Sequence, residues 1–541
     1  MLRYLPFAAS ILLLVVFLAL AMFVAPGWYV ATAVMAGLVA LGIADLAQTS
    51  STLRQNYPLL AHFRYGLESI GPEMRQYFIQ SDTAEVPFSR LQRALVYQRS
   101  KSVNDTRPFG TLQDVYCNDY EWINHSLLPA PLSDPDYRVL VGENTHQPYS
   151  ASVFNISAMS FGSLSANAIR ALNKGAKMGG FYHDTGEGSI SPYHREHGGD
   201  LVWEIGSGYF GCRDENGHFS AERFIENAHD PQVKMIEIKL SQGAKPGHGG
   251  VLPAPKVTEE IALTRGVRPW VECVSPPQHS EFSTPIGLLE FVRKLRELSG
   301  GKPTGFKLAI GHPWEWFGIA KAMAETGILP DFIVVDGAEG GTGAAPAEFM
   351  NQIGVPMHEA LMLVHNTLVG LKLRDDIRLA AAGKITTAFD IARTLAMGAD
   401  WCNSGRGFMF SLGCIQALSC HTDHCPTGVA TQDPRRWKGL DPTDKAVRVM
   451  GFHNNTLHAL RELIAAAGLE NPGQIGPEHI LRRVSATEIR SLSSLYRFLQ
   501  PGELLDGEAS HQVFRDYWAD ARADTFKAPA HVLSMRASKS L

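Results

Sequence analysis

The chain has 541 residues, a formal net charge of −5 at pH 7 and an isoelectric point near 6.5. With 45% hydrophobic residues it can bury a large core, which predicts one main domain with appendages. The acidic balance, without a basic stripe, excludes a nucleic-acid partner. Seven cysteines, an odd number in so long a chain, exclude a disulfide framework and favour a reducing compartment.

The N-terminus carries two apolar stretches. Residues 5–25 are uncharged and long enough to cross a bilayer, and residues 29–44 are nearly as apolar. A cleaved signal peptide is the alternative. The apolar core of a signal peptide is normally shorter, however, and it is not followed so closely by a second apolar stretch, as it is here. We therefore expect a transmembrane hairpin within residues 1–50, with a re-entrant second segment as a variant. Arg3 and Arg54 flank the hairpin, so the remainder of the chain should face the cytoplasm from the inner or cell membrane.

Residues 51–150 mix helical segments with Pro- and Asp-rich turns and predict a connector without chemistry of its own. Beyond them, short apolar runs alternate with glycine-bearing loops and helical patterns. The runs lie at residues 153–158, around 181, and at 233–240, 268–274, 304–310, 331–337, 377–383 and 399–405. Eight such units predict a closed (β/α)8 TIM barrel. An open doubly wound sheet is the alternative, but no G-x-G-x-x-G follows the first run.

In a barrel of this kind, the chemistry gathers where the strands end. Glu187, Lys239, Lys245 and Lys307 lie at predicted strand ends and are expected to point into one mouth. Opposed charges in a confined site hold or activate a carboxylate substrate. The late loops are rich in glycine and end on basic residues such as Arg406, which is typical of a phosphate held by backbone N–H groups.

A short loop, "GCIQALSCHTDHCPTGVATQ" at residues 413–432, holds three of the seven cysteines. Cys414, Cys420 and Cys425 read as a ligand cluster in a reducing compartment. Two kinds of site use such thiolates. One is an iron–sulfur cluster, and the other is a zinc ion completed by His421 or His424, although this spacing is not a usual zinc pattern.

Several long motifs, in a fixed order, now make the chain recognisable. They are "MSFGSLS", "TGEGS", "EIKLSQGAKPGHGG", "SPP", "DGAEGGTGAAP" and the cysteine loop. Residues 153–432 resemble the FMN-binding synthase domain of glutamate synthase, in a single-domain, membrane-anchored form. The resemblance assigns residues 151–432 to a barrel with an iron–sulfur loop, and leaves 433–541 as a C-terminal extension of helices and loops.

The resemblance implies two cofactors. Cys414, Cys420 and Cys425 would hold a 3Fe-4S cluster beside the flavin. The FMN would rest on the first strand's loop, with two side chains at its ring, and its phosphate would lie in the late glycine loops. The residues that the resemblance assigns to FMN are Met159, Ser160, Gly162, Gln242, Lys307, Asp336, Gly340, Gly341, Gly383, Gly405 and Arg406. Lys307 is the candidate for stabilising the negative charge of the reduced ring.

The resemblance also implies a substrate and the residues that bind it. Lys245 and Arg265 match positions that grip the carboxylates of 2-oxoglutarate, and Ser163 joins them as a substrate-binding residue. Glu187, together with Lys239 and Lys245, forms the catalytic set, with Glu187 lining the site and helping with proton transfer. These side chains all come from the predicted mouth of the barrel.

Two departures from the family pattern bear on the substrate and on the source of ammonia. The family motif "GAKPGEGGQLPG" is here "GAKPGHGGVLPA", so His248 replaces an acid and Val251 replaces a substrate-binding glutamine. A lost amide removes one oriented hydrogen bond and puts the exact oxo acid in doubt. The family's glutaminase domain and β-helix domain have no counterpart in this sequence, so ammonia is expected from solution or from a separate glutaminase.

The expected function is therefore reductive amination of 2-oxoglutarate, through its imine, to glutamate. The sequence shows no NAD(P)H-binding fingerprint, so a ferredoxin or a reductase subunit is the expected electron donor. Three alternatives remain open: action on another 2-oxo or amino acid, an electron-transfer protein without amination activity, and a zinc-stabilised scaffold without catalysis. Glu187, Lys245 and Arg265 beside the flavin loops favour an enzyme.

Overall fold

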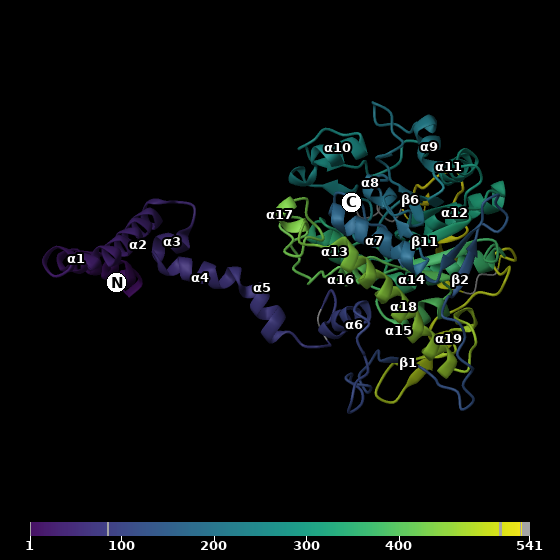
Figure 1. Ribbon diagram of the computed structural model, residues 1–541. Helices are drawn as coiled ribbons and strands as arrows, with labels where there is room; N and C mark the ends of the chain where they lie inside the picture. The colour runs from purple at the N-terminus through teal and green to yellow at the C-terminus, as the bar shows by residue number, and fades with distance from the viewer. Residues whose placement is uncertain (1, 84–85, 508–510, 531, 533–541) are drawn as a thin grey trace, which may run out of the picture. The chain divides into compact units, whose positions relative to one another are not determined.

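The computed structural model describes residues 2–83, 86–507, 511–530 and 532 (Figure 1). The chain divides into two compact units, Met1–Arg90 and Leu91–Leu541. The first unit is a set of helices and the second contains the barrel. Each unit is described by itself below.

The first unit begins with a helical hairpin. Its helices are α1 (Leu5–Phe23) and α2 (Tyr29–Ala47), joined by the short 3-10 helix η2 (Pro26–Trp28). Both helices are long and apolar enough to cross a membrane, by length and composition, and nine tenths of each apolar window is not buried. A signal sequence near the N-terminus can have the same length and apolar composition.

The first unit continues with short helices, of which α3 and the first turn of α4 contact the open end of the hairpin. They are α3 (Thr52–Asn56), α4 (Leu60–Ser69), α5 (Gly71–Met74) and the π-helical turn η3 (Arg75–Ile79), while η1 (Leu2–Tyr4) precedes the hairpin. Arg3 Nη1 donates to Asn56 Oδ1 at 3.2 Å, so the start of the chain lies beside α3. The two ends of the hairpin therefore lie on the same side.

The second unit contains a closed barrel of eight parallel strands, which confirms the predicted fold class. Short apolar runs form these strands because both of their faces are covered, by the barrel interior and by the helices outside. In order around the barrel they are β4 (Phe154–Ile156), β5 (His183–Asp184), β6 (Leu201–Ile205), β7 (Val233–Lys239), β10 (Thr304–Leu308), β11 (Phe332–Asp336), β12 (Arg378–Ala382) and β13 (Trp401–Ser404).

One of the eight predicted strands is wrong. The run at 268–274 contributes only β9 (Cys273–Val274), which pairs antiparallel with β8 (Val251–Leu252) in a two-stranded sheet outside the barrel. The missing barrel strand is β6, whose sequence "LVWEI" was not predicted. A glutamate and a tryptophan interrupt its aliphatic pattern, whereas the run at 268–274 has a proline, which suits an edge strand better than a barrel interior.

Helices pack outside the barrel strands (Figure 1). The larger ones are α7 (Ala166–Gly179), α9 (Ala221–Ala228), α11 (Pro285–Leu298), α12 (Pro313–Thr326), α14 (Met357–Gly370), α15 (Ala388–Ala396) and α18 (Pro442–Ala466). Helix α7 shows why the sequence starts and stops them. Ser165 caps its N-terminus by accepting from Ala168 N, and Gly180 ends it at φ +69°, a left-handed conformation that favours glycine.

Shorter elements complete the second unit. The helical ones are α6 (Arg90–Ser100), α8 (Pro192–Arg195), η4 (Ala254–Lys256), α10 (Glu259–Arg265), α13 (Ala347–Gln352), α16 (Arg406–Ser411), α17 (Pro434–Trp437), η5 (Pro472–Gln474), α19 (Leu492–Leu495) and α20 (Gln512–Tyr517). The extended ones are β1 (Glu121–Ile123), β2 (Arg138–Val141), β3 (Tyr149–Ser152), β14 (Ile480–Arg483) and β15 (Ile489–Ser491). Strand β14 pairs antiparallel with both β1 and β15, so the C-terminal extension is not only helical.

Candidate active site

Three cations and one carboxylate meet at the carboxyl ends of the barrel strands. Glu187 follows β5, Lys239 ends β7, Lys245 lies in the loop after β7, and Arg265 ends α10. Lys239 Nζ lies 3.1 Å from Glu187 Oε1. Lys245 and Arg265 both act electrostatically on Glu187, so the structure brings the four side chains together. The sequence predicted three of them in one mouth.

These four groups are withdrawn from water. Lys245 is 2% exposed, Arg265 4% and Lys239 9%, and the side chain of Glu187 is 14% exposed. Among the residues that the structure describes, no carboxylate forms an ion pair with Lys245 or Arg265. These three buried cations and Glu187 sum to a net charge of about +2, and Lys239 also interacts with the buried carboxyl groups of Asp184 and Asp336. Buried charge without a partner is costly. The arrangement therefore suits a ligand with two negative charges.

Neutral partners hold the two unpaired cations in place. Lys245 Nζ donates to the carbonyl oxygen of Ala344 at 3.0 Å. Arg265 Nη2 donates to Phe161 O at 3.1 Å, and its guanidinium lies over the ring of Phe210 at 5.2 Å. Arg265 Nε is buried without a hydrogen-bond partner. Carbonyls and rings orient a cation without cancelling its charge, so both cations remain available to an anion.

The pKa values follow from this crowding. Burial, and then Lys239, lower the pKa of Lys245 to about 8 although Glu187 opposes them. Burial acts to raise the pKa of Glu187, but the cations around it outweigh burial, so the pKa lies below its ordinary value. Glu187 is therefore ionised at neutral pH, and Lys245 titrates just above neutrality, where an incoming anion would keep it charged.

The loop after β4 lies against these cations. Ser163 Oγ donates to Ser160 O at 2.7 Å, and Gly162 adopts φ +106°, a conformation that favours glycine. Arg265 Nη2 lies 3.4 Å from Ser160 Oγ. At Gly186, a Cβ would lie 2.7 Å from Ser160 N, so the loop carrying Glu187 packs directly on this one. The predicted flavin loop therefore lies beside Arg265, one of the cations predicted to bind the substrate.

The late loops converge on the same mouth. A Cβ at Gly341 would lie 2.7 Å from Arg406 Nε, and Arg406 Nη2 donates to Thr342 O at 3.1 Å. Gly405 precedes α16, and its nearest contact for an added Cβ is Met159 Sδ at 3.7 Å. Backbone thus approaches Arg406 and Met159 closely, in a corner that only glycine-rich loops allow. Such corners present N–H groups and a cation to phosphate.

The other residues assigned to FMN lie in neighbouring loops. Gly243 N donates to Asp336 Oδ2 at 2.8 Å, which ties the loop carrying Gln242 to the end of β11. Gly340 N donates to Gly337 O at 2.9 Å and forms the next turn. A Cβ at Gly383 would lie 2.9 Å from the side chain of Met357. These loops are therefore packed too closely for side chains at the glycine positions.

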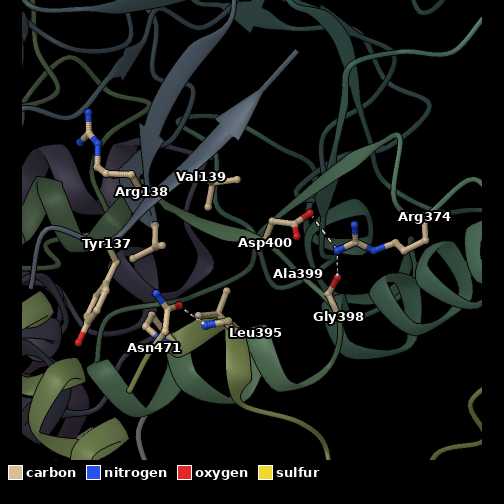
Figure 2. Close-up of a pocket in the computed structure, with 12 residues that line it drawn as sticks. Tyr137, Arg138, Val139, Arg374, Leu395, Gly398, Ala399, Asp400 and Asn471 are labelled. Atoms are coloured by element: carbon tan, nitrogen blue, oxygen red, sulfur yellow. Dashed lines mark hydrogen bonds and ion pairs between the residues drawn. The ribbon is translucent and has the colours of Figure 1, made fainter. Parts of the chain in front are cut away.

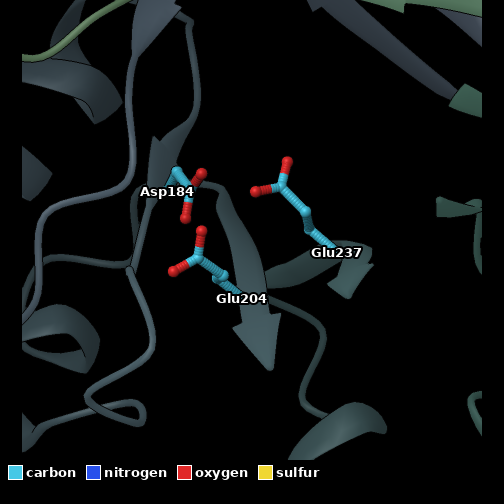
Figure 3. A group of neighbouring side chains, drawn as sticks. All are labelled: Asp184, Glu204 and Glu237. Atoms are coloured by element: carbon cyan, nitrogen blue, oxygen red, sulfur yellow. The ribbon is translucent and has the colours of Figure 1, made fainter. Parts of the chain in front are cut away.

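Lys307 points into a group of acids deeper in the barrel. Figure 3 shows the three acids of this group. Asp184, Glu204 and Glu237 have carboxylate oxygens within 4.8 Å of one another, and all three are buried. We call them the acid cluster. Lys307 Nζ forms an ion pair with Glu204 and lies 3.5 Å from Glu237 Oε1. The structure thus places the Lys307 ammonium among these acids, and its contact with a flavin ring stays a prediction.

One lysine cannot neutralise three buried carboxylates, so the acid cluster retains protons. Burial, then Glu204, raise the pKa of Asp184 to about 7 although Lys307 opposes them. Burial, then Asp184, raise the pKa of Glu237 well above its usual range. Burial acts against the charge of Lys307, but the acids outweigh it and raise the pKa of the lysine. Lys307 is therefore a permanent cation at the floor of the site.

Replacing Asp184 with asparagine tests this charge balance. Because the folded-state pKa of Asp184 is raised from 3.8, its stabilising contribution is present at acid pH and is lost as pH rises through about 7. Asn cannot ionise, and its oxygen can still accept from Gly186 N, which now bonds Asp184 Oδ1 at 3.0 Å. Relative to the wild type, the folding stability of Asp184→Asn should therefore increase from pH 5 to about 7, by about 1.4 kcal/mol per pH unit, and stay constant from there to pH 8. Urea unfolding at pH 5 and pH 8 measures it, and an equal difference at both would contradict the argument.

The three loop cysteines lie beside the flavin loop and carry free thiols. Lys256 Nζ donates to Ala430 O at 2.9 Å and to Ser163 O at 3.3 Å, and so joins the two loops. Gln432 Nε2 donates to Gly162 O at 3.0 Å. Cys420 and Cys425 act electrostatically on Lys256, which is consistent with their sulfurs lying near its ammonium. The cysteine loop is therefore fastened to the first loop of the site.

The remaining contacts describe the environment of the cysteines. Burial raises the pKa of Cys414 to about 11, and Tyr97 OH donates to its carbonyl oxygen at 2.6 Å. Cys425 is buried, and Thr427 Oγ1 lies 3.5 Å from its sulfur. Burial acts to raise the pKa of Cys425, but hydrogen bonds from Thr427 and the following backbone outweigh it and lower the pKa. Cys425 is therefore prepared for the thiolate form that metal ligands require.

A separate cavity of about 290 Å³ lies at the amino ends of β4 and β13, on the face opposite the site (Figure 2). Its cations are already satisfied. Arg374 Nη2 donates to Asp400 Oδ2 and to Gly398 O, both at 2.9 Å, and Arg138 Nη1 lies 3.5 Å from Asp136 Oδ1. A cavity with neutralised cations has no unmet demand for a ligand, so we assign it a structural role.

Sequence reasoning missed the acid cluster and Lys256. The signal for the acids was present, because Glu204 and Glu237 are each the only acid inside the apolar runs "LVWEI" and "VKMIEIK". Neighbouring strands β6 and β7 place these two glutamates in register. For Lys256 no sequence signal marks the role, since it lies in a short 3-10 helix far from the cysteines along the chain.

The conserved region in glutamate synthase matches residues 130–470, more than half of the chain. The glutamate synthase large subunit-like protein YerD of Bacillus subtilis is 37% identical over 495 residues, which cover 84% of this chain and 94% of that protein. The archaeal glutamate synthase (NADPH) of Methanocaldococcus jannaschii is 34% identical over 317 residues, 58% of this chain and 59% of that one.

The coverage of larger relatives is lower. The glutamate synthase (NADPH) large chain of Bacillus subtilis is 34% identical over 326 residues, which are 20% of its length. The chain thus spans less than two thirds of the archaeal enzyme and of this large chain. Among solved structures, mandelate oxidase with (S)-2-phenylpropionate is 13% identical to this chain, with a TM-score of 0.41. The match covers 74% of this chain and 98% of that one. The matched region and the near-full-length relative show that the chain belongs to the glutamate synthase family and is an oxidoreductase of that type.

Proposed function

We propose that the chain is a membrane-anchored, FMN- and iron–sulfur-dependent enzyme that converts 2-oxoglutarate, through its imine, to glutamate. The observation that carries this proposal is the buried net charge of about +2 at the barrel mouth. Lys239, Lys245 and Arg265 face a single carboxylate there, beside the predicted flavin loop. A 2-oxo dicarboxylate has the charge that such a site lacks, and removing it from water costs less where cations are already in place.

The residues at the site fit FMN. Glycines at the loop tips bring backbone N–H groups and Arg406 together, in space that a side chain at Gly341 would fill. Arg265 Nε, beside the same loops, is a buried hydrogen-bond donor without an acceptor. When bound, FMN would accept electrons one at a time and deliver hydride to the substrate carbon. Met159, Ser160 and the late glycines would hold it, and Lys307 would supply a positive charge that stabilises its reduced form.

The cysteine loop fits an iron–sulfur cluster better than a single zinc ion. Tetrahedral zinc at about 2.3 Å from each sulfur needs its thiolates within roughly 4 Å of one another. Among the described His, Cys, Asp and Glu side chains, the group whose ligand atoms lie within 4.8 Å of one another is the acid cluster, and the three cysteines form no such group. Cys414, Cys420 and Cys425 would instead ligate a cluster of several irons, the proposed 3Fe-4S centre.

The chain's own residues have distinct tasks in this scheme. Lys245 and Arg265 bind the two carboxylates of the substrate and fix its orientation. Lys239 holds the Glu187 carboxylate at 3.1 Å, so that it can move a proton at the substrate nitrogen. The acid cluster holds Lys307 in place and keeps this cation charged. Burial of all these groups excludes water, which strengthens each electrostatic contact.

We further propose the source of ammonia, the electron donor and the cellular location of the enzyme. Ammonia comes from solution or a separate glutaminase, and electrons come from a ferredoxin or reductase subunit through the cluster. Helices α1 and α2 insert into the cell membrane, with the barrel on the cytoplasmic side. The contact of Arg3 with Asn56 supports a hairpin whose two ends lie on one side.

A panel of 2-oxo acids tests the substrate. The full-length protein is reduced with a low-potential donor, and flavin reoxidation and product are followed with each acid, with and without ammonium. We expect 2-oxoglutarate with ammonium to reoxidise the flavin fastest and to yield glutamate. Val251 stands where the family has a glutamine, so an apolar 2-oxo acid is the competing candidate. If such an acid reacts and 2-oxoglutarate does no better than buffer, the substrate assignment is wrong.

A further inference from the structure

The helices that follow the hairpin carry a continuous apolar face. From α4 through η3, large apolar side chains recur every three or four residues, which places them within about 100° of arc on one side. We call this set the apolar stripe. It consists of Leu60, Phe63, Leu67, Ile70, Met74, Tyr77 and Phe78.

The apolar stripe is exposed along its whole length. The exposed fractions run from 45% at Leu60 and Met74 to 70% at Phe63 and 77% at Phe78. Large exposed apolar patches on a protein mark a surface that meets another apolar phase. Polar residues, including Glu68, which pairs with Arg64 at 2.7 Å, lie outside the stripe on the same helices, together with Tyr65 and Ile79. The segment is therefore amphipathic, with one face suited to water and one to lipid or protein.

The structure fixes where the apolar stripe begins. Asp45, near the end of α2, is 2% exposed and accepts hydrogen bonds from Leu59 N at 3.1 Å and from His62 Nε2 at 2.8 Å. Gln48 Nε2 also donates to Ser51 O at 2.9 Å and shapes the turn between the helices. These contacts fasten the first turn of α4 to the end of α2. The stripe therefore starts where the second apolar helix ends.

We propose that the apolar stripe lies in the interfacial layer of a phospholipid bilayer, with α4, α5 and η3 running along the membrane surface. The inference rests on the proposed insertion of α1 and α2, because the Asp45 contacts place α4 at the depth where α2 leaves the hydrocarbon. An interfacial helix buries its apolar face ~5–10 Å into the boundary between headgroups and acyl chains.

The composition of the segment favours lipid as the partner. Tyr77 is of the aromatic type that concentrates at membrane interfaces, and Phe63 and Phe78 are of the type that interfacial helices bury in lipid. Arg64 and Arg75 follow the apolar stripe along one edge, at helical positions from which long basic side chains reach lipid phosphates. Binding to a protein partner or to a second copy of the chain would not require basic residues along the edge of an aromatic, apolar face.

Photocrosslinking of the full-length protein tests the proposal. The probe is p-benzoyl-L-phenylalanine, introduced in separate variants at Phe63, at Phe78 and, as the matched control, at Tyr65. Tyr65 is also aromatic and is 40% exposed, but it lies two residues from Phe63 on the opposite face, with its hydroxyl 3.1 Å from Ser51 Oγ. Each variant is reconstituted in vesicles of phosphatidylethanolamine and phosphatidylglycerol, floated on a density gradient, irradiated and analysed by mass spectrometry.

We expect lipid adducts at Phe63 and Phe78 to exceed those at Tyr65 by about tenfold, since only the stripe lies within the boundary layer. Equal lipid labelling at all three positions would overturn the proposal, as would adducts of Phe63 and Phe78 with the barrel or with a second copy. The flotation step separates this failure from failure of the anchor. If the protein does not float, insertion of the hairpin is wrong and the inference falls with it, whereas a floating protein without stripe adducts refutes the inference alone.

Discussion

Replacing Cys420 with serine is expected to remove the iron–sulfur cluster while FMN remains bound. A cluster held by three thiolates has no ligand to spare, and a serine hydroxyl is a poor substitute for thiolate at iron. The three cysteines sit in one loop, and Cys425 already lies in an environment that favours the thiolate. Iron, acid-labile sulfide and the visible spectrum of the purified variant measure the loss, and FMN released on denaturation measures what remains.

FMN should survive this substitution because other contacts fasten the flavin loop. Lys256 holds it through Ser163 O, and Gln432 holds it through Gly162 O, and neither contact involves a cysteine. Cys117→Ser is the matched control, since Cys117 is an exposed free thiol outside the loop and its replacement should change neither cofactor. A colourless wild-type protein with stoichiometric zinc would refute the cluster. Retention of full iron content in Cys420→Ser would refute this ligand set.

The barrel could be predicted from the sequence because its strands obey one rule. Seven of the eight runs are short, apolar and followed by a glycine loop, and the structure places all seven in the barrel. The rule failed at β6, where Trp203 and Glu204 break the aliphatic run. Trp203 is fully buried against Phe224, while Glu204 turns inward to Lys307. A strand whose interior position carries a charge is recognisable only when its partner across the barrel is known.

The site could be predicted in part for the same reason. Glu187, Lys239 and Lys245 follow strand ends, so chain order alone places them at one face of the barrel. Arg265 came only from the family resemblance, since it ends a short helix in a long excursion after β7. The depth of each side chain could not be predicted. Lys307 was expected beside the other lysines, and the structure draws its ammonium down to the acid cluster because two glutamates attract it there.

The connector shows a different limit. Residues 51–150 were predicted to carry no chemistry, and the helical period of the apolar stripe within them was overlooked. The stripe spans α4, α5 and η3, so no single helix displays it, and Gly71 and Pro72 interrupt the pattern between Ile70 and Met74. Only the near-continuous path of the three helices aligns the exposed side chains on one face. A pattern carried across helix breaks needs the three-dimensional path before it can be recognised.

Replacing Lys245 with alanine should weaken binding of the oxo acid severely without loss of FMN. At the barrel mouth, Lys245 and Arg265 are buried cations that form no ion pair with a described carboxylate, and removing one member of a buried charge pair costs about 2–5 kcal/mol. That corresponds to a rise in Kd between about 30-fold and several thousand-fold. Titration of 2-oxoglutarate into the oxidised protein, followed by the flavin spectrum, measures it. Lys294→Ala, at an exposed lysine paired with Glu281, is the matched control and should leave Kd unchanged.

The pH dependence of 2-oxoglutarate binding should show whether the positive charge of Lys245 binds the substrate. Its pKa of about 8 in the free protein is below the usual value, and only the protonated form attracts a carboxylate. Affinity for the dianion should therefore be constant below about pH 8 and fall about tenfold per pH unit above it, until the higher pKa of the complex is reached. In Lys245→Ala this fall should vanish, while Lys245→Arg, which stays charged, should bind with no fall across the same range. If the affinity of the wild type does not change between pH 7 and 9.5, the charge of Lys245 does not contribute to substrate binding. The buried net charge at the barrel mouth would then no longer support 2-oxoglutarate as the substrate.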